Sequence, residues 1–394
     1  MRSEWIKKKL SDIADFNPRE TIKKGAIVKK IPMDVLRPFY RDIPYYVEEC
    51  FSGGMKFRNG DTIMARITPC LENGKTAQVS ILNDGEVGFG STEYIVFRAK
   101  EGIADKDYLY YLVCSPEVRE PAIKSMVGSS GRQRVQTDVV KNLEIDVPPL
   151  VDQEKIGSFL KAFDDKIALN DKINKNLEQQ AGALFHSLFV ENANPTWKDG
   201  VLSDLGTVVA GGTPSKTKSE YYSEHGIAWI TPKDLSLNKS KFISHGENDI
   251  SELGFSKSSA TKMPTGTVLF SSRAPIGYIA IAANEVTTNQ GFKSVVPNEN
   301  VGTAFMYYLL KFLLPTIDGM ASGSTFKEIS GAVMKSIPVL IPDNETIEKF
   351  NAFCAPIFQQ QEVLEVENSR LTDIRDALLP KLISGELDVS NIDL

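Results

Sequence analysis

Three short strings in the chain combine residue types that carry catalysis in other proteins. Gly74-Lys75-Thr76 ends like a nucleotide-binding loop, but Pro69 occupies the position of the first glycine that such a loop requires. Asn17-Pro18 is followed by Arg19, where a methyltransferase motif needs a second proline. Asp152–Lys155 offer the carboxylates and the lysine of a nuclease, yet acidic groups at the start of a helix are better explained by the helix dipole. The sequence therefore predicts no catalytic site on this chain.

The cysteine and histidine residues do not have the spacing of a metal site. There is no Cys-x-x-Cys pair, and the histidines are scattered. We therefore expect buried free thiols and no bound metal. The residues concerned are Cys50, Cys70, Cys114, Cys354, His186, His225 and His245.

Composition and charge are those of an ordinary globular protein with more than one domain. The chain has 394 residues, of which 42% are hydrophobic and 24% charged, and no apolar run approaches the roughly eighteen residues of a membrane helix. Its charged N-terminal residues lack the apolar core of a signal peptide, so we expect a cytoplasmic protein with no membrane partner. The net charge of −6 comes mainly from residues 343–394, which hold eleven acidic and four basic residues. Because the rest of the chain is close to neutral, the charge does not exclude a nucleic acid partner.

The sequence contains an internal repeat with a period of about 195 residues. Trp5-x4-Leu10-Ser11-Asp12 recurs as Trp197-x4-Leu202-Ser203-Asp204, and the run Gly128-Ser129-Ser130-Gly131 returns as Ala321-Ser322-Gly323-Ser324. A repeat of this length indicates duplicated domains and not a solenoid. Many of the matches are similarities, so the two copies have diverged.

The first part of each copy predicts mixed α and β structure. Thr62–Ala65 and Thr267–Phe270 are short apolar runs bounded by Gly, Pro and Asn, as strands are, and Tyr278–Ala283 has the same character. Tyr110-Tyr111-Leu112 recurs as Tyr307-Tyr308-Leu309 and indicates one helix in each copy.

Each copy ends in a long stretch whose apolar residues follow the three- and four-residue steps of a coiled-coil seam. Two matched seams, each with central amide side chains, favour pairing of the two helices with each other. An amphipathic helix packed on its own domain remains the alternative. The seam residues that we expect in the helix pair are Ile156, Phe163, Ile167, Asn174, Leu177, Leu184, Ile357, Leu364, Asn368, Leu371, Leu378 and Leu382.

Prolines and turn residues divide the chain into four segments. Pro148-Pro149 and Pro342 precede the two long helices, and Asn192-Ala-Asn194-Pro195 ends the first of them. The predicted fold class is mixed α/β, with two tandem α/β domains separated by two long helices that form an antiparallel coiled coil. The predicted segments are domain 1 over residues 1–150, a helix over 151–192, domain 2 over 197–342 and a second helix over 343–387.

Several long strings resemble the specificity subunits of type I restriction–modification systems. Pro148–Ile156 and Asp165–Glu178 are similar to the central conserved region of that family, and Leu378–Leu387 to its C-terminal signature. Gly211–Ser215 and Trp229–Leu235 are similar to the opening of many of its target-recognition domains. The resemblance covers nearly the whole chain, and several independent strings contribute to it.

This resemblance implies a non-catalytic protein whose two target-recognition domains read the two halves of an asymmetric, split site in double-stranded DNA. Phe16–Arg19 replace the Gly-Gly-Thr-Pro loop in the first copy, which suggests that the two domains have unlike targets. Arginine can bind guanine through two hydrogen bonds, and Asn or Gln can bind adenine in the same way. From their positions in or near glycine-rich loops, we predict DNA contacts for Arg66, Arg132, Gln133, Arg134, Thr213, Lys233, Arg273, Asn289, Gln290 and Lys327.

The resemblance also implies partner proteins. The helix pair would bind two methyltransferase subunits and, through them, the restriction motor–nuclease subunits; AdoMet, ATP and Mg²⁺ would belong to these partners and not to this chain. A helix of about 35 residues spans on the order of 50 Å, which is enough to hold two readers about one DNA turn apart. Two other functions remain open: an interaction scaffold that binds no DNA, and a specificity subunit that serves methylation alone.

Overall fold

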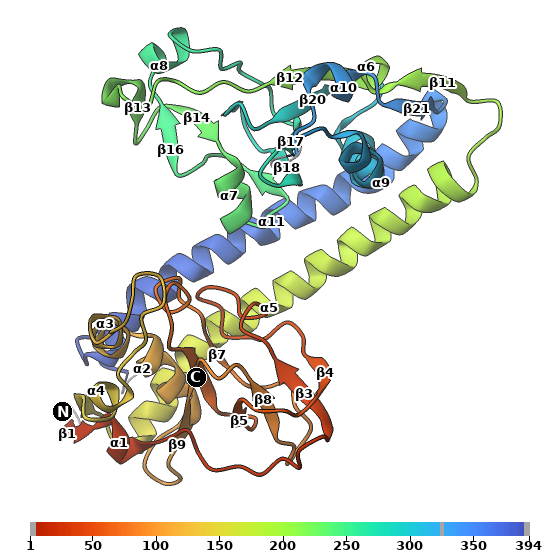
Figure 1. Cartoon of the computed structure of the whole chain (residues 1–394). Coiled ribbons are helices and arrows are strands. Elements are labelled where there is room, and N and C mark those ends of the chain that lie inside the picture. The colour runs from red at the N-terminus through yellow and green to blue at the C-terminus, as the bar shows by residue number, and fades with distance from the viewer. Residues whose placement is uncertain (1–4, 324–326, 390–394) are drawn as a thin grey trace. The chain divides into compact units, whose positions relative to one another are not determined.

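The computed structural model describes residues 5–323 and 327–389 (Figure 1). Residues 1–4, where the first predicted domain begins, and Ser324, at the end of the second Gly-Ser run, lie outside the described residues. The chain forms two compact units, Met1–Leu169 with Asn368–Leu394, and Asn170–Glu367. Each unit combines most of one copy of the repeat with a part of both long helices. The four predicted segments divide the chain differently and stay a prediction.

The first unit contains two four-stranded sheets and one pair of strands. In β9, Ile95 and Phe97 belong to a core that the helices share, whereas Tyr94 and Val96 belong to a second core, because neighbours along a strand point to opposite faces. The sheet that contains β9 therefore lies between the helices and the other sheet. The strand orders are β2 (Ala14–Phe16), β9 (Tyr94–Ala99), β6 (Thr62–Ala65), β7 (Thr76–Gln78); β4 (Val47–Cys50), β3 (Ile27–Ile31), β8 (Gly88–Gly90), β5 (Met55–Phe57); and β1 (Ile6–Lys9) with β10 (Glu144–Val147).

Helix α2 (Lys106–Cys114) lies at the centre of the core that the helices of the first unit share. Asp105 caps it by accepting a hydrogen bond from the N–H of Tyr108 at 2.8 Å. Most of its residues, Tyr108 to Val113, are buried, as an all-round apolar helix requires. The shorter helices of this unit are α1 (Leu10–Ile13), α3 (Pro116–Lys124) and α4 (Thr137–Lys141).

The second unit has the same layers. In β17, Val268 and Phe270 point into a core shared with helix α9, and Leu269 points into the core between the two sheets. The strand orders are β12 (Gly206–Ala210), β20 (Lys293–Pro297), β17 (Val268–Ser272), β18 (Ile276–Ala282), β15 (Phe242–Ile243); β13 (Tyr222–Ser223), β16 (Asn248–Ile250), β14 (Ile227–Ile230), β19 (Thr287–Thr288); and β11 (Lys198–Val201) with β21 (Pro338–Ile341).

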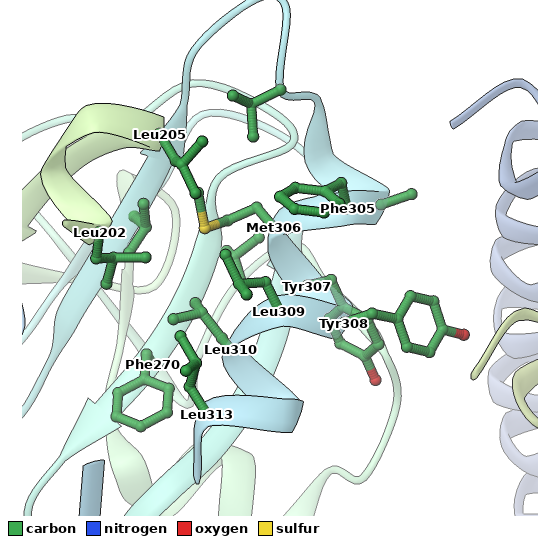
Figure 2. Close-up of a cluster of buried hydrophobic side chains, with 14 of the residues drawn as sticks. Leu202, Leu205, Phe270, Phe305, Met306, Tyr307, Tyr308, Leu309, Leu310 and Leu313 are labelled. Carbon is green, nitrogen blue, oxygen red and sulfur yellow. The ribbon is translucent and has the colours of Figure 1, made fainter. Parts of the chain in front are cut away.

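Helix α9 (Thr303–Met320) supplies the largest share of the core that it forms with β17 in the second unit (Figure 2). Met306 and Leu310 point towards Leu202 and Phe270, while Tyr308 extends from the opposite side of the helix. The remaining helices of this unit are α6 (Leu202–Leu205), the 3₁₀ turn η2 (Ser219–Tyr221), α7 (Pro232–Leu237), α8 (Glu252–Ser256) and α10 (Gly331–Lys335).

The sequence repeat is a repeat of topology. In the first unit, Thr62 of β6 pairs with Gln78 on one side and with Phe97 on the other. In the second unit, Val268 of β17 pairs with Ile281 and Val295 in the same manner. The parallel pair β3–β8 likewise has its counterpart in β14–β19. The prediction of two duplicated α/β domains is therefore confirmed.

The two long helices are α5 (Leu150–His186), which continues as the π-helical turn η1 (Ser187–Glu191), and α11 (Asn344–Ile383). They run antiparallel in both units. In the first, Asp164 of α5 forms an ion pair with Arg375 of α11. In the second, Asn170 donates a hydrogen bond to Glu367 at 2.8 Å, and Gln361 donates one to the carbonyl of Asn174 at 3.1 Å. Within each unit the residue numbers rise along one helix as they fall along the other, so the helices pair in the antiparallel orientation that was predicted.

All the predicted seam residues are buried or half-buried. They do not face only the opposite helix, however. Ile156 and Leu382 lie in the core that contains α2, and Ile357 lies in the core that contains α9. Each long helix therefore packs both on the other helix and on its own domain, so the alternative interpretation holds alongside helix pairing. The apolar face of each helix is wide enough to contact both.

Replacing Asp164 with Asn tests the ion pair of the first unit. Asp164 and Arg375 are almost fully buried, and the hydroxyl of Tyr111 also donates to Asp164 at 2.6 Å. The change leaves the buried Arg375 guanidinium with the exposed Asp376 as its remaining countercharge and should destabilise the fold by about 3 kcal/mol. Asp373→Asn, at an exposed position of α11, is the matched control. Urea unfolding followed by circular dichroism measures both; equal midpoints for the two variants would show that the pair contributes nothing.

Candidate nucleic-acid interface

The four DNA contacts predicted in the first unit lie together at one end of its central sheet. The turn that follows β6 runs beside the segment around Arg134. The N–H of Val135 donates to the carbonyl of Arg66 at 2.9 Å, and the N–H of Thr68 donates to the carbonyl of Gln133 at 3.0 Å. Val127 and Arg134 exchange two backbone hydrogen bonds, which close the Gly-Ser run into a loop. Backbone bonds therefore hold Arg66, Gln133 and Arg134 in place, whatever their side chains contact.

Glu93 is the acidic centre of this loop surface. Arg134 donates to it through Nε at 3.0 Å and through Nη2 at 2.7 Å, and the Nε of Arg66 lies 3.9 Å away. The Arg134 guanidinium lowers the pKa of the Glu93 carboxyl, so Glu93 is ionised at neutral pH. Sequence reasoning missed Glu93, because a partner 41 residues away follows no spacing rule.

Arg132 and Gln133 stand apart from this cluster. The Arg132 side chain is exposed, and that of Gln133 is half-buried. Within residues 5–323 and 327–389, neither side chain forms a hydrogen bond or an ion pair. Their donors and acceptors are available to a ligand.

In the second unit, backbone hydrogen bonds bring separate loops to one surface. The N–H of Gly212 donates to Thr288 at 2.8 Å, and that of Asn289 donates to Ile230 at 3.0 Å. The N–H of Ser272 donates to Gly291 at 2.7 Å. These bonds join the loop after β12, the end of β14, the turn after β17 and the loop after β19. The residues predicted to contact DNA in this domain lie on these segments, on the loop that reaches Glu328 and, for Lys233, at the start of helix α7.

Glycine is required where two of these loops meet. A Cβ on Gly211 would overlap the carbonyl oxygen of Asn289, and one on Gly212 would overlap the backbone of Ser259 and Ala260. The indole N–H of Trp229 donates to the Gly212 carbonyl at 3.0 Å. The Gly-Gly-Thr-Pro string is therefore explained by close backbone contact.

Most of the predicted side chains of the second domain have partners inside the protein. Thr213 donates a hydrogen bond to Gln290, and the Oδ1 of Asn289 accepts the N–H of Gly291 at 2.8 Å. Lys233 forms an exposed ion pair with Glu247 at 2.5 Å. Asn289 thus uses its acceptor to shape the loop, in the manner of an Asx turn.

The other cations of this surface are held by two acidic residues. Arg273 lies 3.4 Å from Glu328 through Nη1, and Lys293 lies 3.7 Å from the same carboxylate. Lys327 contacts Asp318 at 3.0 Å. Neither acid could be predicted from the sequence, because both pairs depend on loop contacts that no local pattern reveals.

The loop surfaces of the two units are equivalent in backbone but not in charge. Arg134 forms a β-bridge with Ile67, and Glu328 forms the matching bridge with Arg273. A cation in the first unit therefore stands where the second has an anion. Both loop surfaces nevertheless contain an ion pair: Arg134 binds Glu93 in the first unit, and Arg273 binds Glu328 in the second.

Two further expectations concern metals and membranes. In the part of the chain that the structure describes, no group of three His, Cys, Asp or Glu side chains is placed to hold a metal ion. No helix among these residues has the length and apolar character of a membrane span.

The cysteines differ in their exposure. Cys354 is buried, whereas Cys50 is exposed on β4, which corrects the expectation of buried thiols throughout. The exposure follows from the position of β4 at a sheet edge.

Comparison with known proteins identifies the family. The model of the type I restriction modification DNA specificity domain matches residues 2–179 and 194–366. Because these two matches cover most of the chain, it belongs to the family of type I restriction–modification specificity subunits. The resemblance seen in its sequence is thereby confirmed, and specificity subunits are the DNA-recognition component of these systems.

Individual relatives agree with this assignment. The chain is 24% identical to the HindI specificity subunit of Haemophilus influenzae, over 98% of this chain and 100% of that protein. It is 40% identical to the MjaIX specificity subunit of Methanocaldococcus jannaschii, but the match spans only 39% of this chain and 36% of that relative. The crystal structure of the type I S subunit from M. genitalium has a similar fold, with a TM-score of 0.60, 18% identity, and coverage of 97% of this chain and 96% of that one.

Gly212→Ala tests whether close backbone contact shapes the loop surface. The added methyl group should destabilise the second unit by roughly 1–3 kcal/mol, because the atoms around it are mostly backbone and cannot turn aside. Gly319→Ala is the control, since a Cβ there meets nothing within 4 Å and favours the helix. Thermal unfolding followed by circular dichroism and by tryptophan fluorescence measures the effect; a Gly212 variant as stable as the control would contradict it.

Proposed function

We propose that this chain is the non-catalytic reader of a split, asymmetric site in double-stranded DNA, with one half-site for each domain. The repeated loop surface carries the proposal. In both units, the turn after the central strand lies against a second loop and is held by equivalent backbone bonds, while the side chains differ, as at Arg134 and Glu328. One framework with two unlike surfaces suits two dissimilar half-sites.

The side chains at these surfaces suit base recognition. Arg132 and Gln133 have free polar groups, and Arg273 uses only Nη1 in its contact with Glu328, among the hydrogen bonds of the described residues. A guanidinium with free N–H groups can bind guanine through two hydrogen bonds, and an amide can bind adenine. Lys233 and Lys327, both exposed, suit phosphate contacts.

The net charge of −6 is compatible with this function. Each half-site alone would bind weakly, but linking two domains raises the effective concentration of the second contact. Partner subunits would add phosphate contacts of their own.

We also propose that α5 and α11 set the gap between the half-sites and bind two methyltransferase subunits, which recruit the motor–nuclease subunits. Antiparallel pairing of the helices supports a stiff spacer. The second unit also leaves apolar side chains of these helices exposed: Ile173 at 37%, Val363 at 56% and Val366 at 59%. Exposed apolar groups on a helix pair favour a protein partner. AdoMet, ATP and Mg²⁺ would act on those partners.

A methylome tests the whole proposal. The chain is co-expressed with its native methyltransferase subunit in a host without methylation, and modified adenines are mapped across the genome. We expect one split motif with two dissimilar halves and a fixed gap. If the complex forms and the methyltransferase is active, an unsplit motif would indicate a single working domain, and no new methylation would favour a scaffold that binds no DNA.

Single arginine variants test which domain reads which half. Arg134→Ala should relax one half of the motif and Arg273→Ala only the other, each by about 1–3 kcal/mol of base discrimination. Lys335→Ala, at an exposed position of α10 in the second unit, is the control. Methylation rates on synthetic duplexes with single base changes measure the effect. Variants that slow methylation equally on all duplexes would show phosphate contacts, and a variant that relaxes both halves would contradict separate reading.

A further inference from the structure

A buried cation lies at the same position of both domains. In the first unit, the carbonyl of Arg41 accepts the N–H of Gln78 at 3.0 Å. In the second, the carbonyl of Lys241 accepts the N–H of Ile281 at 2.7 Å. Because Gln78 and Ile281 occupy matching register positions beside the central strands, Arg41 and Lys241 are structural equivalents.

Both residues are only 7% exposed. Lysine and arginine are seldom buried to this degree unless they are paired, because removing a charge from water is unfavourable. Neither residue belongs to the loop surface described above. Their burial therefore requires a separate explanation.

Lys241 points at the two long helices of its unit. Its ammonium group contacts Glu178 of α5, donates to the Oε1 of Gln361 of α11 at 2.6 Å, and lies 4.2 Å from the ring centre of Phe358. One side chain thus contacts both helices. It lies directly before β15, the edge strand of its sheet.

The backbone beside Lys241 is bound to the same helices. The N–H groups of Lys241 and Phe242 both donate to the carboxylate of Glu365 on α11, at 2.7 and 3.0 Å. Glu178 in turn accepts the hydroxyl of Tyr308 at 2.9 Å and contacts Lys311. Although burial alone would raise it, the two neighbouring ammonium groups lower the pKa of Glu178 to about 2.

Arg41 makes the corresponding contact in the first unit. Its Nη2 donates to Asp165 of α5 at 2.5 Å, and its Nε donates to Asp42 at 2.9 Å. Asp165 also contacts Lys161 at 2.5 Å. The preceding residue of α5, Asp164, accepts the hydroxyl of Tyr111, as Glu178 accepts that of Tyr308.

We propose that Arg41 and Lys241 are positioning residues that fix the orientation of each recognition domain on its own stretch of the long helices, so that the gap between half-sites is read strictly. The inference rests on the proposed function. Apolar contacts between a helix and a sheet tolerate small shifts, whereas hydrogen bonds between buried charged groups weaken steeply with distance and angle. A buried ion pair therefore contributes more to a single arrangement than to net stability, the role attributed to polar groups in helix seams.

Lys241→Met and Arg41→Met test the proposal. Methionine keeps an unbranched apolar side chain of similar length, and Glu178 retains Tyr308 and Lys311 as partners. In the methylome assay, each variant should keep both half-site sequences but methylate sites whose gap is one base pair longer or shorter, at least tenfold more than the unmodified chain does. Lys241→Arg, which keeps the positive charge, should keep the gap between the half-sites as strict as in the unmodified chain. Lys198→Met, on exposed β11, is the matched control and should leave the gap unchanged.

The outcomes separate this inference from the proposed function. If the unmodified chain gives no split motif, the proposed function fails. If it gives one, and the folded methionine variants keep the gap as strict as the control does, the positioning role is overturned. Circular dichroism and thermal unfolding establish folding. If Lys241→Met unfolds, the double variant Lys241→Met with Glu178→Gln, which removes the countercharge as well, is measured in its place. It should also methylate sites with a longer or shorter gap, and a strict gap in this variant would overturn the positioning role.

Discussion

Each long helix has an apolar face that must be covered, because a helix of this kind gains most of its stability from packing. In each unit, the cover comes both from the other helix and from the domain, as the shared core of Ile156, Leu382 and α2 shows. The rest of the structure depends on this double packing. It presents the sheet of each domain to the helices, and the charged groups buried within the interface are paired, as Asp164 is with Arg375.

The duplicated domains separate framework from surface. Equivalent backbone bonds hold the loops, from Val135 to Arg66 in one unit and from Ile329 to Ser272 in the other. Since those bonds do not involve side chains, the side chains can change without loss of the loop. This is how an arginine and a glutamate can occupy matching positions, at 134 and 328, on one fold.

Local patterns predicted the fold well, whereas the candidate site was only partly accessible. Heptad steps are short-range signals and led to α5 and α11. The repeat, although its period is long, can be recognised by comparing the two halves of the sequence, and it led to the paired topology. Glycine-rich loops led to Arg134 and Arg273, but not to their acidic partners, because Arg273 and Glu328 are 55 residues apart. The contact between Lys241 and Gln361 spans 120 residues and has no local pattern. Such pairs exist only once the sheets and helices are packed.

The acidic partners at the loop surfaces bear on how a protein of net charge −6 could select a sequence. Under the proposed function, a cation that is already bound to a carboxylate must break that ion pair before it contacts a phosphate, which would weaken non-specific binding. Arg134 exchanges the bonds that it donates to Glu93 most readily for an acceptor that replaces them with similar geometry. Guanine offers two acceptors in one plane, as a carboxylate does, whereas other bases do not present this pair to the major groove. Under the proposed function, internal ion pairing would therefore raise specificity by lowering the affinity for every wrong site.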